Sequence, residues 1–327
     1  MSTPSITQAN VDRLVTVFGG SGFLGRHIIR LLCKRGYRVR VAVRRPDLAG
    51  HLQPLGRVGQ IHAVQANLRY PASVEAAVQG ADVVINLVGI LFERGRQRFD
   101  AVQAEGPGLV ARAGTAAGAR LIHVSALGTS KDSPALYART KAAGEDAVRA
   151  EVPAAIIFRP SIVFGPEDDF FNRFGAMARF SPMLPLIGGG ATRFQPVFVG
   201  DVAAAVAMAA DGAVKPGTIY ELGGPDVRTF RQLMEFVLAT TQRRRLLVPI
   251  PFALAGFQAW FLQFMPKPLL TPDQVRLLKT DNVVSADAAR EGRTLEGLGI
   301  EPHSMAAIVP SYLWRFRKTG QFRSRMA

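Results

Sequence analysis

The sequence predicts an α/β fold in which a doubly wound parallel sheet is followed by a smaller, mostly helical C-terminal domain. In the first half of the chain, short apolar runs rich in β-branched residues alternate with stretches of helical spacing. Strands that are apolar throughout and separated by helices are typical of a parallel sheet covered on both faces. The composition, 48% hydrophobic and 20% charged residues, excludes a disordered chain. A length of 327 residues allows one large domain or two.

The expected elements of the sheet follow one another without an internal repeat. Helical spacing is clearest where Phe23, Leu24, Ile28 and Leu31 recur on one face. Strands are expected at residues 14–18, 38–43, 60–65, 81–88, 120–125 and 154–159, and helices at 23–34, 74–78, 99–117 and 136–150. Parallel strands joined in this way need right-handed crossovers, which place helices on the two faces of the sheet.

The second half of the chain is less regular. A segment rich in Phe, Pro, Met and Gly precedes a short strand and a helix that starts near Asp201, and a further strand is expected at 218–222. Thr229 and Gln232 have the spacing of a capping box, which predicts a helix over 230–241. The expected domains are 1–165 with roughly 191–223, and 166–190 with 224–327.

A glycine-rich loop follows the first expected strand and opens the first expected helix. It reads Gly19-Gly20-Ser21-Gly22-Phe23-Leu24-Gly25. Gly19 permits a tight turn, Gly22 lets the backbone approach a pyrophosphate, and Gly25 lets the helix pack on the strand. The amides at the helix N-terminus then face the anion. The loop therefore predicts a Rossmann-type dinucleotide site, with a glycine turn that binds nothing as the alternative.

Two arginines stand where the second strand ends, which is the position that selects the ribose. An acidic residue there would bind a 2′-hydroxyl, whereas a guanidinium suits a 2′-phosphate. Arg44 and Arg45 therefore favour NADP(H), with NAD(H) as the other candidate. A solvated basic turn is the alternative interpretation.

Tyr137 and Lys141 lie four residues apart on an expected helix, so their side chains share one face. A nearby ammonium lowers the pKa of a phenol, which can then exchange a proton with a carbonyl or an alcohol. Lysine can also hold the nicotinamide ribose. The alternative is that both residues only hold the cofactor.

The C-terminal half contains an apolar stretch, residues 252–265, that follows Arg243, Arg244 and Arg245. As a helix it would span about 21 Å, which is short of the roughly 30 Å of a hydrocarbon core. It could lie in a membrane interface, or it could be a core helix. The formal net charge of +15 and a basic, aromatic tail at 314–325 suggest an anionic partner, which could be a membrane surface, an acidic protein surface or phosphates. A solvated basic tail is the alternative. No nucleic-acid-binding motif is present, so we expect no nucleic acid partner.

The single cysteine, Cys33, excludes an intrachain disulfide, a multi-cysteine zinc site and an iron–sulfur cluster built from this chain alone. We expect no bound metal. The first residues lack the apolar region of a secretory signal, and no apolar stretch of 18 residues free of proline and charge suggests a spanning helix.

Together these residues resemble the short-chain dehydrogenase/reductase superfamily. The stretch from Arg159 to Pro166 is similar to the sixth-strand motif of its extended members, and the stretch from Phe194 to Ala203 is similar to their later strand–helix return. The resemblance implies that Tyr137, Lys141 and Ser125 are the catalytic residues if the protein is active. It implies cofactor contacts from the glycine loop, from the two arginines, and from Asn67, Leu68, Val88, Gly89, Tyr137, Lys141 and Pro160.

Two positions depart from the superfamily pattern. The catalytic serine or threonine at the end of the fifth strand falls on Ser125 or on Ala126. Asn67 replaces the aspartate that usually follows the third strand near the adenine.

The order of these motifs and the C-terminal portion are similar to one family within the superfamily, the accessory NAD(P)H-binding subunit of respiratory complex I (alpha-subcomplex subunit nine) and its bacterial relatives. This resemblance implies a bound NADPH without turnover and a place among complex I subunits near the quinone site. It also implies a peripheral position on the cytoplasmic side of the inner membrane, or on the matrix side in a mitochondrion. The rival interpretation is an active reductase, epimerase or dehydratase that uses Tyr137 as acid–base.

Overall fold

The computed structural model describes residues 10–266 and 268–320. The chain divides into two compact units, within Met1–Arg159 with Val202–Tyr220 and within Pro160–Asp201 with Glu221–Ala327. The expected division placed residues 160–165, 191–201 and 221–223 in the first domain, whereas the contacts group them with the second unit. The short strands in the first two stretches pair with each other or with another strand of the second unit.

A seven-stranded sheet has the order β11-β6-β5-β4-β1-β2-β3. Its strands are β1 (Leu14–Phe18), β2 (Arg38–Val43), β3 (Ile61–Gln65), β4 (Val83–Asn86), β5 (Arg120–Val124), β6 (Ile156–Pro160) and β11 (Ile219–Leu222). Every pair from β3 to β6 is parallel. The strand order reverses at β1, which lies between β2 and β4, so a crevice opens beyond the carboxyl ends of these strands.

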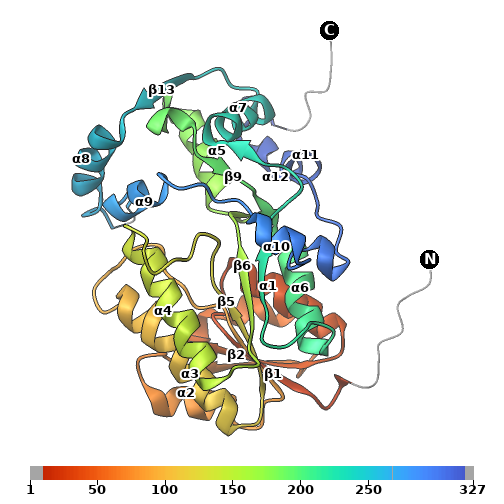
Figure 1. The fold of residues 1–327 in the computed structure, drawn as a ribbon. Helices are drawn as coiled ribbons and strands as arrows, with labels where there is room; N and C mark the ends of the chain where they lie inside the picture. The colour runs from red at the N-terminus through yellow and green to blue at the C-terminus, as the bar shows by residue number, and fades with distance from the viewer. Residues whose placement is uncertain (1–9, 267, 321–327) are drawn as a thin grey trace. The chain divides into compact units, whose positions relative to one another are not determined.

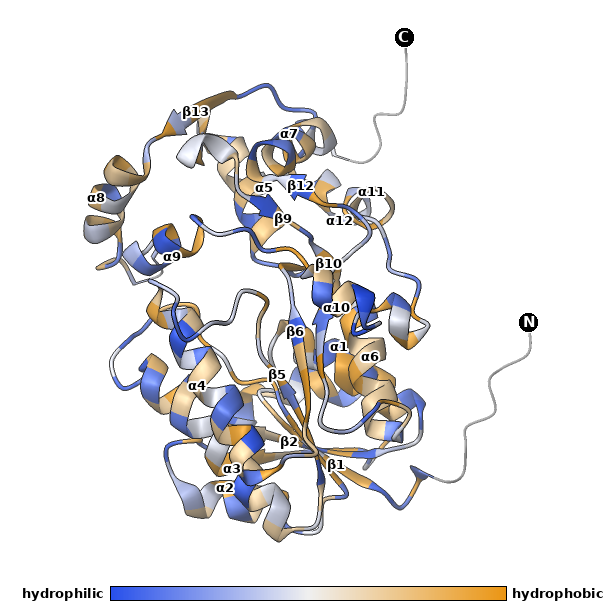
Figure 2. Ribbon diagram, viewed as in Figure 1, coloured by the Kyte–Doolittle hydropathy of each residue, from blue (hydrophilic) through white to orange (hydrophobic). Residues whose placement is uncertain are grey.

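Helices cover both faces of the sheet in the first unit (Figure 1). The helices are α1 (Phe23–Lys34), α2 (Pro71–Val78), α3 (Gly106–Ala116), α4 (Leu136–Glu151) and α6 (Val199–Asp211), with short 3₁₀ turns η2 (Pro46–Leu48) and η3 (Gly50–Leu55). In Figure 1, α2, α3 and α4 lie along one face, and α1 and α6 along the other. The strands are largely hydrophobic (Figure 2), and β1 is buried along its whole length. The doubly wound parallel sheet expected from the sequence is confirmed.

The helix expected at 99–117 is divided, which the sequence did not predict. A π-helical turn, η4 (Asp100–Glu105), precedes α3. Pro107 has no N–H to donate to the carbonyl of Gln103, so regular α-helical bonding fails there. Gly144 of α4 lies against this carbonyl, which a Cβ at position 144 would overlap.

The second unit combines three short strand pairs with helices. The pairs are β7 (Val163–Phe164) with β10 (Val197–Phe198), β9 (Arg193–Phe194) with β12 (Arg228–Thr229), and β8 (Met183–Ile187) with β13 (Leu246–Ile250). The helices are α5 (Phe170–Phe180), α7 (Phe230–Thr241), α8 (Phe252–Leu262), α9 (Pro272–Leu277), α10 (Ala286–Arg290), α11 (Met305–Ile308) and α12 (Pro310–Leu313), with 3₁₀ turns η5 (Gly188–Gly190), η6 (Glu296–Leu298) and η7 (Trp314–Phe316). The capping box of α7 is confirmed, because Thr229 and Gln232 exchange both hydrogen bonds.

Candidate dinucleotide-binding site

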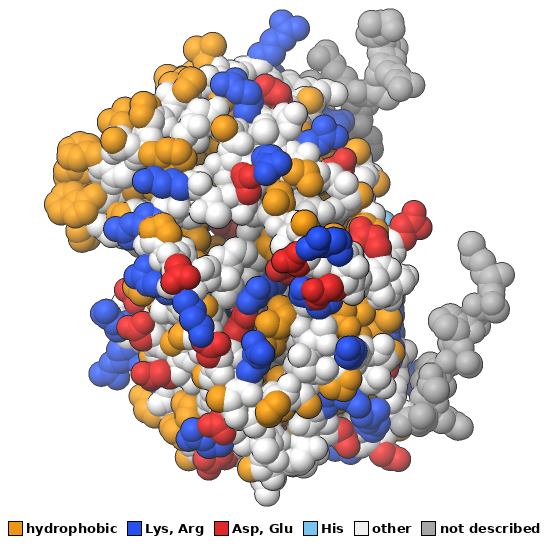
Figure 3. Space-filling model, viewed as in Figure 1, with side chains coloured by type: hydrophobic (Ala, Val, Ile, Leu, Met, Phe, Trp, Pro, Cys, Tyr) orange, Lys and Arg blue, Asp and Glu red, His pale blue; other side chains and the backbone are white. Residues whose placement is uncertain are grey.

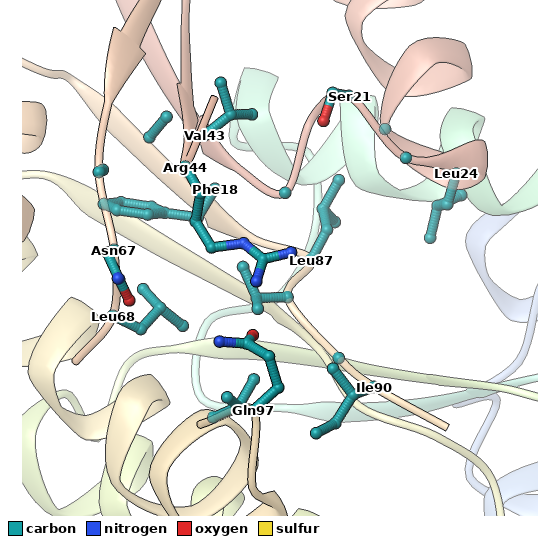
Figure 4. Close-up of a pocket in the computed structure, with 18 of the residues that line it drawn as sticks. Phe18, Ser21, Leu24, Val43, Arg44, Asn67, Leu68, Leu87, Ile90 and Gln97 are labelled. Atoms are coloured by element: carbon teal, nitrogen blue, oxygen red, sulfur yellow. The ribbon is translucent and has the colours of Figure 1, made fainter. Parts of the chain in front are cut away.

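A pocket of about 400 Å³ opens at the carboxyl ends of β1, β2, β3 and β4 in the first unit (Figure 4). Its lining comprises Phe18, Gly19, Ser21, Gly22, Phe23, Leu24, Gly25, Ala42, Val43, Arg44, Ala66, Asn67, Leu68, Leu87, Val88, Gly89, Ile90, Gln97 and Val102. Arg44 is the one charged residue in this lining, which contains no aspartate or glutamate. A pocket of this character suits an anionic ligand.

The positions of Gly19, Gly20 and Gly25 require glycine for different structural reasons. Gly19 has a positive φ of 75°, and a Cβ there would lie 3.3 Å from the backbone of Leu87 and Val88. A Cβ on Gly25 would overlap the carbonyl oxygen of Gly20. Gly20 does not line the pocket. A Cβ at this position would lie only 2.8 Å from Val41 Cγ1, on the side of the core. Gly20 therefore serves packing behind the loop.

The N-terminus of α1 is open toward the pocket. Its N-cap is Gly22, which has an extended conformation and no side chain that could cap the helix. The first-turn residues Phe23, Leu24 and Gly25 line the pocket. Amides of a first turn lack intrahelical acceptors and carry a partial positive charge, so this end of the helix can bind a phosphate.

The two neighbouring arginines differ in their surroundings. The Arg45 guanidinium donates to the Asp47 carboxylate at 2.6 Å and lies outside the pocket lining. Arg44 has no hydrogen-bond or ion-pair partner among residues 10–266 and 268–320. Figure 4 shows its side chain reaching into the pocket toward the side where Leu87 and Gln97 lie. Of the pair, Arg44 is placed to meet a ligand.

Asn67 and Leu68 line the pocket beyond β3, where the sequence placed the adenine. The Oδ1 atom of Asn67 accepts from the amide of Arg69 at 3.2 Å. This bond leaves the two amide hydrogens of Asn67 to donate to a ligand, whereas an aspartate could only accept. Figure 4 shows the amide directed into the pocket.

Two glutamines at the other end of the pocket were missed by the sequence analysis. Gln97 lines the pocket directly. Gln103 is buried in η4, and its Oε1 accepts from the amide of Ile90 at 3.2 Å while its Nε2 donates to Thr140. No pattern in the sequence around Gln103, which lies between Asp100 and Glu105, marks it out.

Lys141 is buried on α4 behind the pocket wall. Its Nζ lies 3.5 Å from the carbonyl oxygen of Val124, and a Cβ on pocket-lining Gly89 would lie 3.3 Å from it. Burial lowers the pKa of Lys141 to about 8, and the Coulombic effect of Glu145 acts in the opposite direction. Glu145 itself is held by Arg159, whose Nη2 donates to it at 2.6 Å.

The environment of Tyr137 differs from the expectation. Its ring stacks edge-on against Phe99, with the ring centroids 6.0 Å apart. Burial raises the pKa of Tyr137 to about 12, whereas the sequence analysis expected Lys141 to lower it. The reason is that loss of solvent disfavours the phenolate, and this effect is the dominant one here.

Ser125 is buried just after β5. Its hydroxyl lies 3.3 Å from that of Thr129, which donates in turn to the carbonyl of Ala126. Pro160 ends β6 and opens the second unit, and it is not part of the pocket lining. Tyr137, Lys141 and Ser125 are likewise absent from that lining. The catalytic roles expected for these residues remain predictions.

A buried histidine lies near Lys141. His123 on β5 is 1% exposed, and its Nδ1 lies 3.3 Å from the side-chain nitrogen of Asn86. Its Nε2 is buried without a partner in the described part of the chain. Burial, and secondarily the charge of Lys141, lowers the pKa of His123 to about 3. The imidazole is therefore neutral at physiological pH.

Comparisons with known proteins agree with this pocket. The family model described as the NAD dependent epimerase/dehydratase family matches residues 15–223. The mitochondrial NADH dehydrogenase (ubiquinone) 1 alpha subcomplex subunit 9 of Arabidopsis thaliana is 38% identical over 94% of this chain and 79% of its own length. The subunit of the same name from Rattus norvegicus is 35% identical over 88% of this chain and 76% of its own length. The chain belongs to the subunit 9 family.

This subunit 9 family member also shares its fold with distant solved structures. One is the NADPH-dependent quinone oxidoreductase of Escherichia coli complexed with NADPH. The TM-score is 0.72 at 20% sequence identity, with 91% of this chain and 99% of that chain covered. At this identity the likeness shows the fold alone.

The subunit 9 family member has an unusual helix in its second unit. On α8, Ala255 and Ala259 are buried, whereas Phe257, Trp260 and Phe261 are 63%, 53% and 54% exposed. Figure 3 shows hydrophobic side chains gathered over α8. Small residues thus face the protein and aromatic ones face solvent, the reverse of a core helix. Among the described residues, no helix is long and apolar enough to span a membrane.

Proposed function

We propose that this chain is a nicotinamide dinucleotide-binding accessory subunit of complex I that binds its cofactor for structural purposes. The observation that carries the proposal is the pocket at the reversal of strand order, which is lined by the glycine loop, the open end of α1 and Arg44. The similarity to subunit 9 over 94% of the chain supports the complex I association. We place this association near the quinone site.

The residues present fit a phosphorylated dinucleotide. The amides of Ser21 to Gly25 would hold the pyrophosphate, and Asn67 would donate to the adenine. The unpaired guanidinium of Arg44 would hold a 2′-phosphate, which favours NADP(H) over NAD(H). Lys141, close to Gly89, would hold the nicotinamide ribose. When bound, the nicotinamide supplies hydride chemistry.

The surroundings of Tyr137 and Ser125, the residues that would catalyse, favour a binding role over turnover. The raised pKa of Tyr137 makes it a poor proton donor or acceptor near neutral pH. The hydroxyl of Ser125 lies beside that of Thr129. Binding to the native state alone stabilises it by roughly 4 kcal/mol at a thousandfold ligand excess over Kd.

The outward aromatic face of α8 supports a peripheral position on an anionic membrane surface. Aromatic rings and flanking basic residues are typical of helices that lie in the interface. For a bacterial chain this surface is the cytoplasmic side of the inner membrane, and for a mitochondrial chain it is the matrix side.

Purification from native membranes in mild detergent tests the accessory role. We expect the full chain to co-elute with complex I subunits, and we expect the Tyr137→Phe variant to do the same, because turnover is not required. A chain recovered alone, together with steady NADPH oxidation by a carbonyl compound that Tyr137→Phe abolishes, would contradict the proposal and establish an enzyme.

A further inference from the structure

Three segments of the second unit contain lysines and arginines but no aspartate or glutamate. These segments are residues 170–200, 236–272 and 302–327, which hold three, four and five lysines or arginines respectively. An acid-free basic segment can attract an anionic partner.

Three arginines from two of these segments form a cluster, which we call the arginine cluster: Arg179, Arg243 and Arg245. The Nε of Arg245 donates at 2.9 Å to the carbonyl of Ala178, directly before Arg179. The Nε of Arg243 donates at 2.7 Å to the carbonyl of Phe316. Backbone carbonyls thus orient the guanidiniums of Arg243 and Arg245, and neither arginine forms an ion pair with a carboxylate in the described part of the chain.

The guanidiniums of the arginine cluster repel one another. Burial, and then the charges of Arg245 and Arg179, lowers the pKa of Arg243, and no carboxylate is among the causes. The two Nη atoms of Arg243 are not used in the bond to Phe316, and Nη2 of Arg245 is not used in its bonds to Ala178 and Arg244. A group with several anionic oxygens would relieve this repulsion and accept these donors.

Exposed apolar side chains stand beside the cluster. Phe180 is 84% exposed, and the Arg179 guanidinium lies over its ring at 5.3 Å. Met183 and Leu246 are 46% and 69% exposed and face each other in the register of β8 and β13. From Leu246, β13 leads over about 16 Å to the outward aromatic face of α8. Charge and apolar surface thus alternate along one continuous part of the second unit.

We propose that the arginine cluster binds the phosphate groups of anionic phospholipids, while Phe180, Met183 and Leu246 enter the apolar boundary of the same bilayer. A soluble phosphate compound would account for the arginines but not for the exposed apolar residues next to them. The inference rests on the peripheral membrane position proposed above, and it is independent of the dinucleotide. It adds to the proposed membrane position the residues that would make binding specific for anionic lipids.

Co-sedimentation of the full chain with vesicles tests the inference. One set of vesicles contains phosphatidylcholine alone, and the other contains phosphatidylcholine mixed with phosphatidylglycerol. Each basic residue near an anionic surface contributes about fivefold to partitioning. We therefore expect Arg179→Gln to weaken binding to the anionic vesicles about fivefold, and the triple substitution by Gln to weaken it about 100-fold. Binding to phosphatidylcholine should remain unchanged.

Controls separate the possible failures. Arg57→Gln removes an exposed arginine of the first unit and should leave both vesicle titrations within about twofold of wild type. Within residues 10–266 and 268–320 the Arg179 side chain donates to no backbone carbonyl, so its variant should fold, and unchanged NADPH binding verifies this. Phe180→Ser should weaken binding to both kinds of vesicle.

Three outcomes would overturn the inference. If wild type binds the anionic vesicles as expected and Arg179→Gln has no effect on this binding, the arginine cluster does not bind lipid phosphates, although the proposed membrane position still holds. If wild type binds NADPH but binds neither kind of vesicle, the proposed membrane position is also wrong, whereas the proposed dinucleotide binding is unaffected. Arginine-dependent thermal stabilisation by inorganic phosphate, without any arginine dependence on vesicles, would indicate a free-phosphate site instead.

Discussion

Arg44 and Arg45 show how two adjacent, identical side chains acquire different roles. Arg45 is bonded to Asp47, two residues away, and points outside the pocket. Arg44 keeps its donors free and lies in the pocket lining. The sequence assigned both to the cofactor, since spacing along the chain cannot show which side of a turn a side chain takes.

The proposed preference for a 2′-phosphate can be tested at Arg44. Arg44→Ala should weaken NADPH binding about 10- to 100-fold, because a hydrogen bond to a charged group contributes roughly 1.5–3 kcal/mol. NADH affinity should change by less than about twofold. Isothermal titration calorimetry with both dinucleotides measures the effect, and Arg45→Ala is the matched control. Equal losses for NADPH and NADH would show that Arg44 does not contact the 2′-phosphate.

At the scale of elements, most boundaries were readable because their signals are local. The helix α1 spans the expected residues 23–34, and α7 begins at its capping box as predicted. The expected helix at 99–117 was wrong in its continuity, because Pro107 cannot donate to the carbonyl of Gln103; this carbonyl lies against Gly144 of another helix. The sequence could not show which face of α8 is buried, because this depends on the packing of Ala255 and Ala259 with distant residues such as Ile187 and Val275.

The capping box of α7 has a measurable effect on stability. Thr229→Ala removes the hydroxyl that accepts from the Gln232 amide, which should lower the free energy of unfolding by about 1 kcal/mol. Thr229→Ser keeps the acceptor and should stay close to wild type. Urea unfolding followed by circular dichroism measures both variants. An equal loss in the serine variant would mean that the methyl group, not the cap, supplies the stability.

At the scale of the whole molecule, polar groups are buried deep in the first unit, and the second unit contains three basic segments without aspartate or glutamate. Asn86, Gln103, His123, Lys141 and Glu145 are all nearly inaccessible to solvent. Burial lowers the pKa of His123 and that of Lys141, so the protonation of these two groups is tied to folding and stability depends on pH.

His123 should make the protein acid-sensitive. Its pKa is about 3 when folded against an ordinary value of 6.5, so the unfolded chain binds a proton first as pH falls. Stability is therefore lost as pH drops from 6.5 toward 3, by about 1.5 kcal/mol between pH 6.5 and pH 5. His123→Gln should flatten this dependence in urea titrations, whereas His62→Gln, at an exposed position, should not. The same pH slope in wild type and His123→Gln would refute the assignment.

The sequence by itself determined the parallel α/β fold, the order of its elements and the glycine loop, because strand and helix spacing and turn chemistry involve residues close together in the chain. Only the tertiary structure decided which arginine enters the pocket, that Gln97 lines it, and that burial raises the pKa of Tyr137. It also decided that α8 turns its rings outward and that distant arginines meet without a carboxylate. These features depend on burial and on contacts between residues far apart in the chain, which local patterns do not encode.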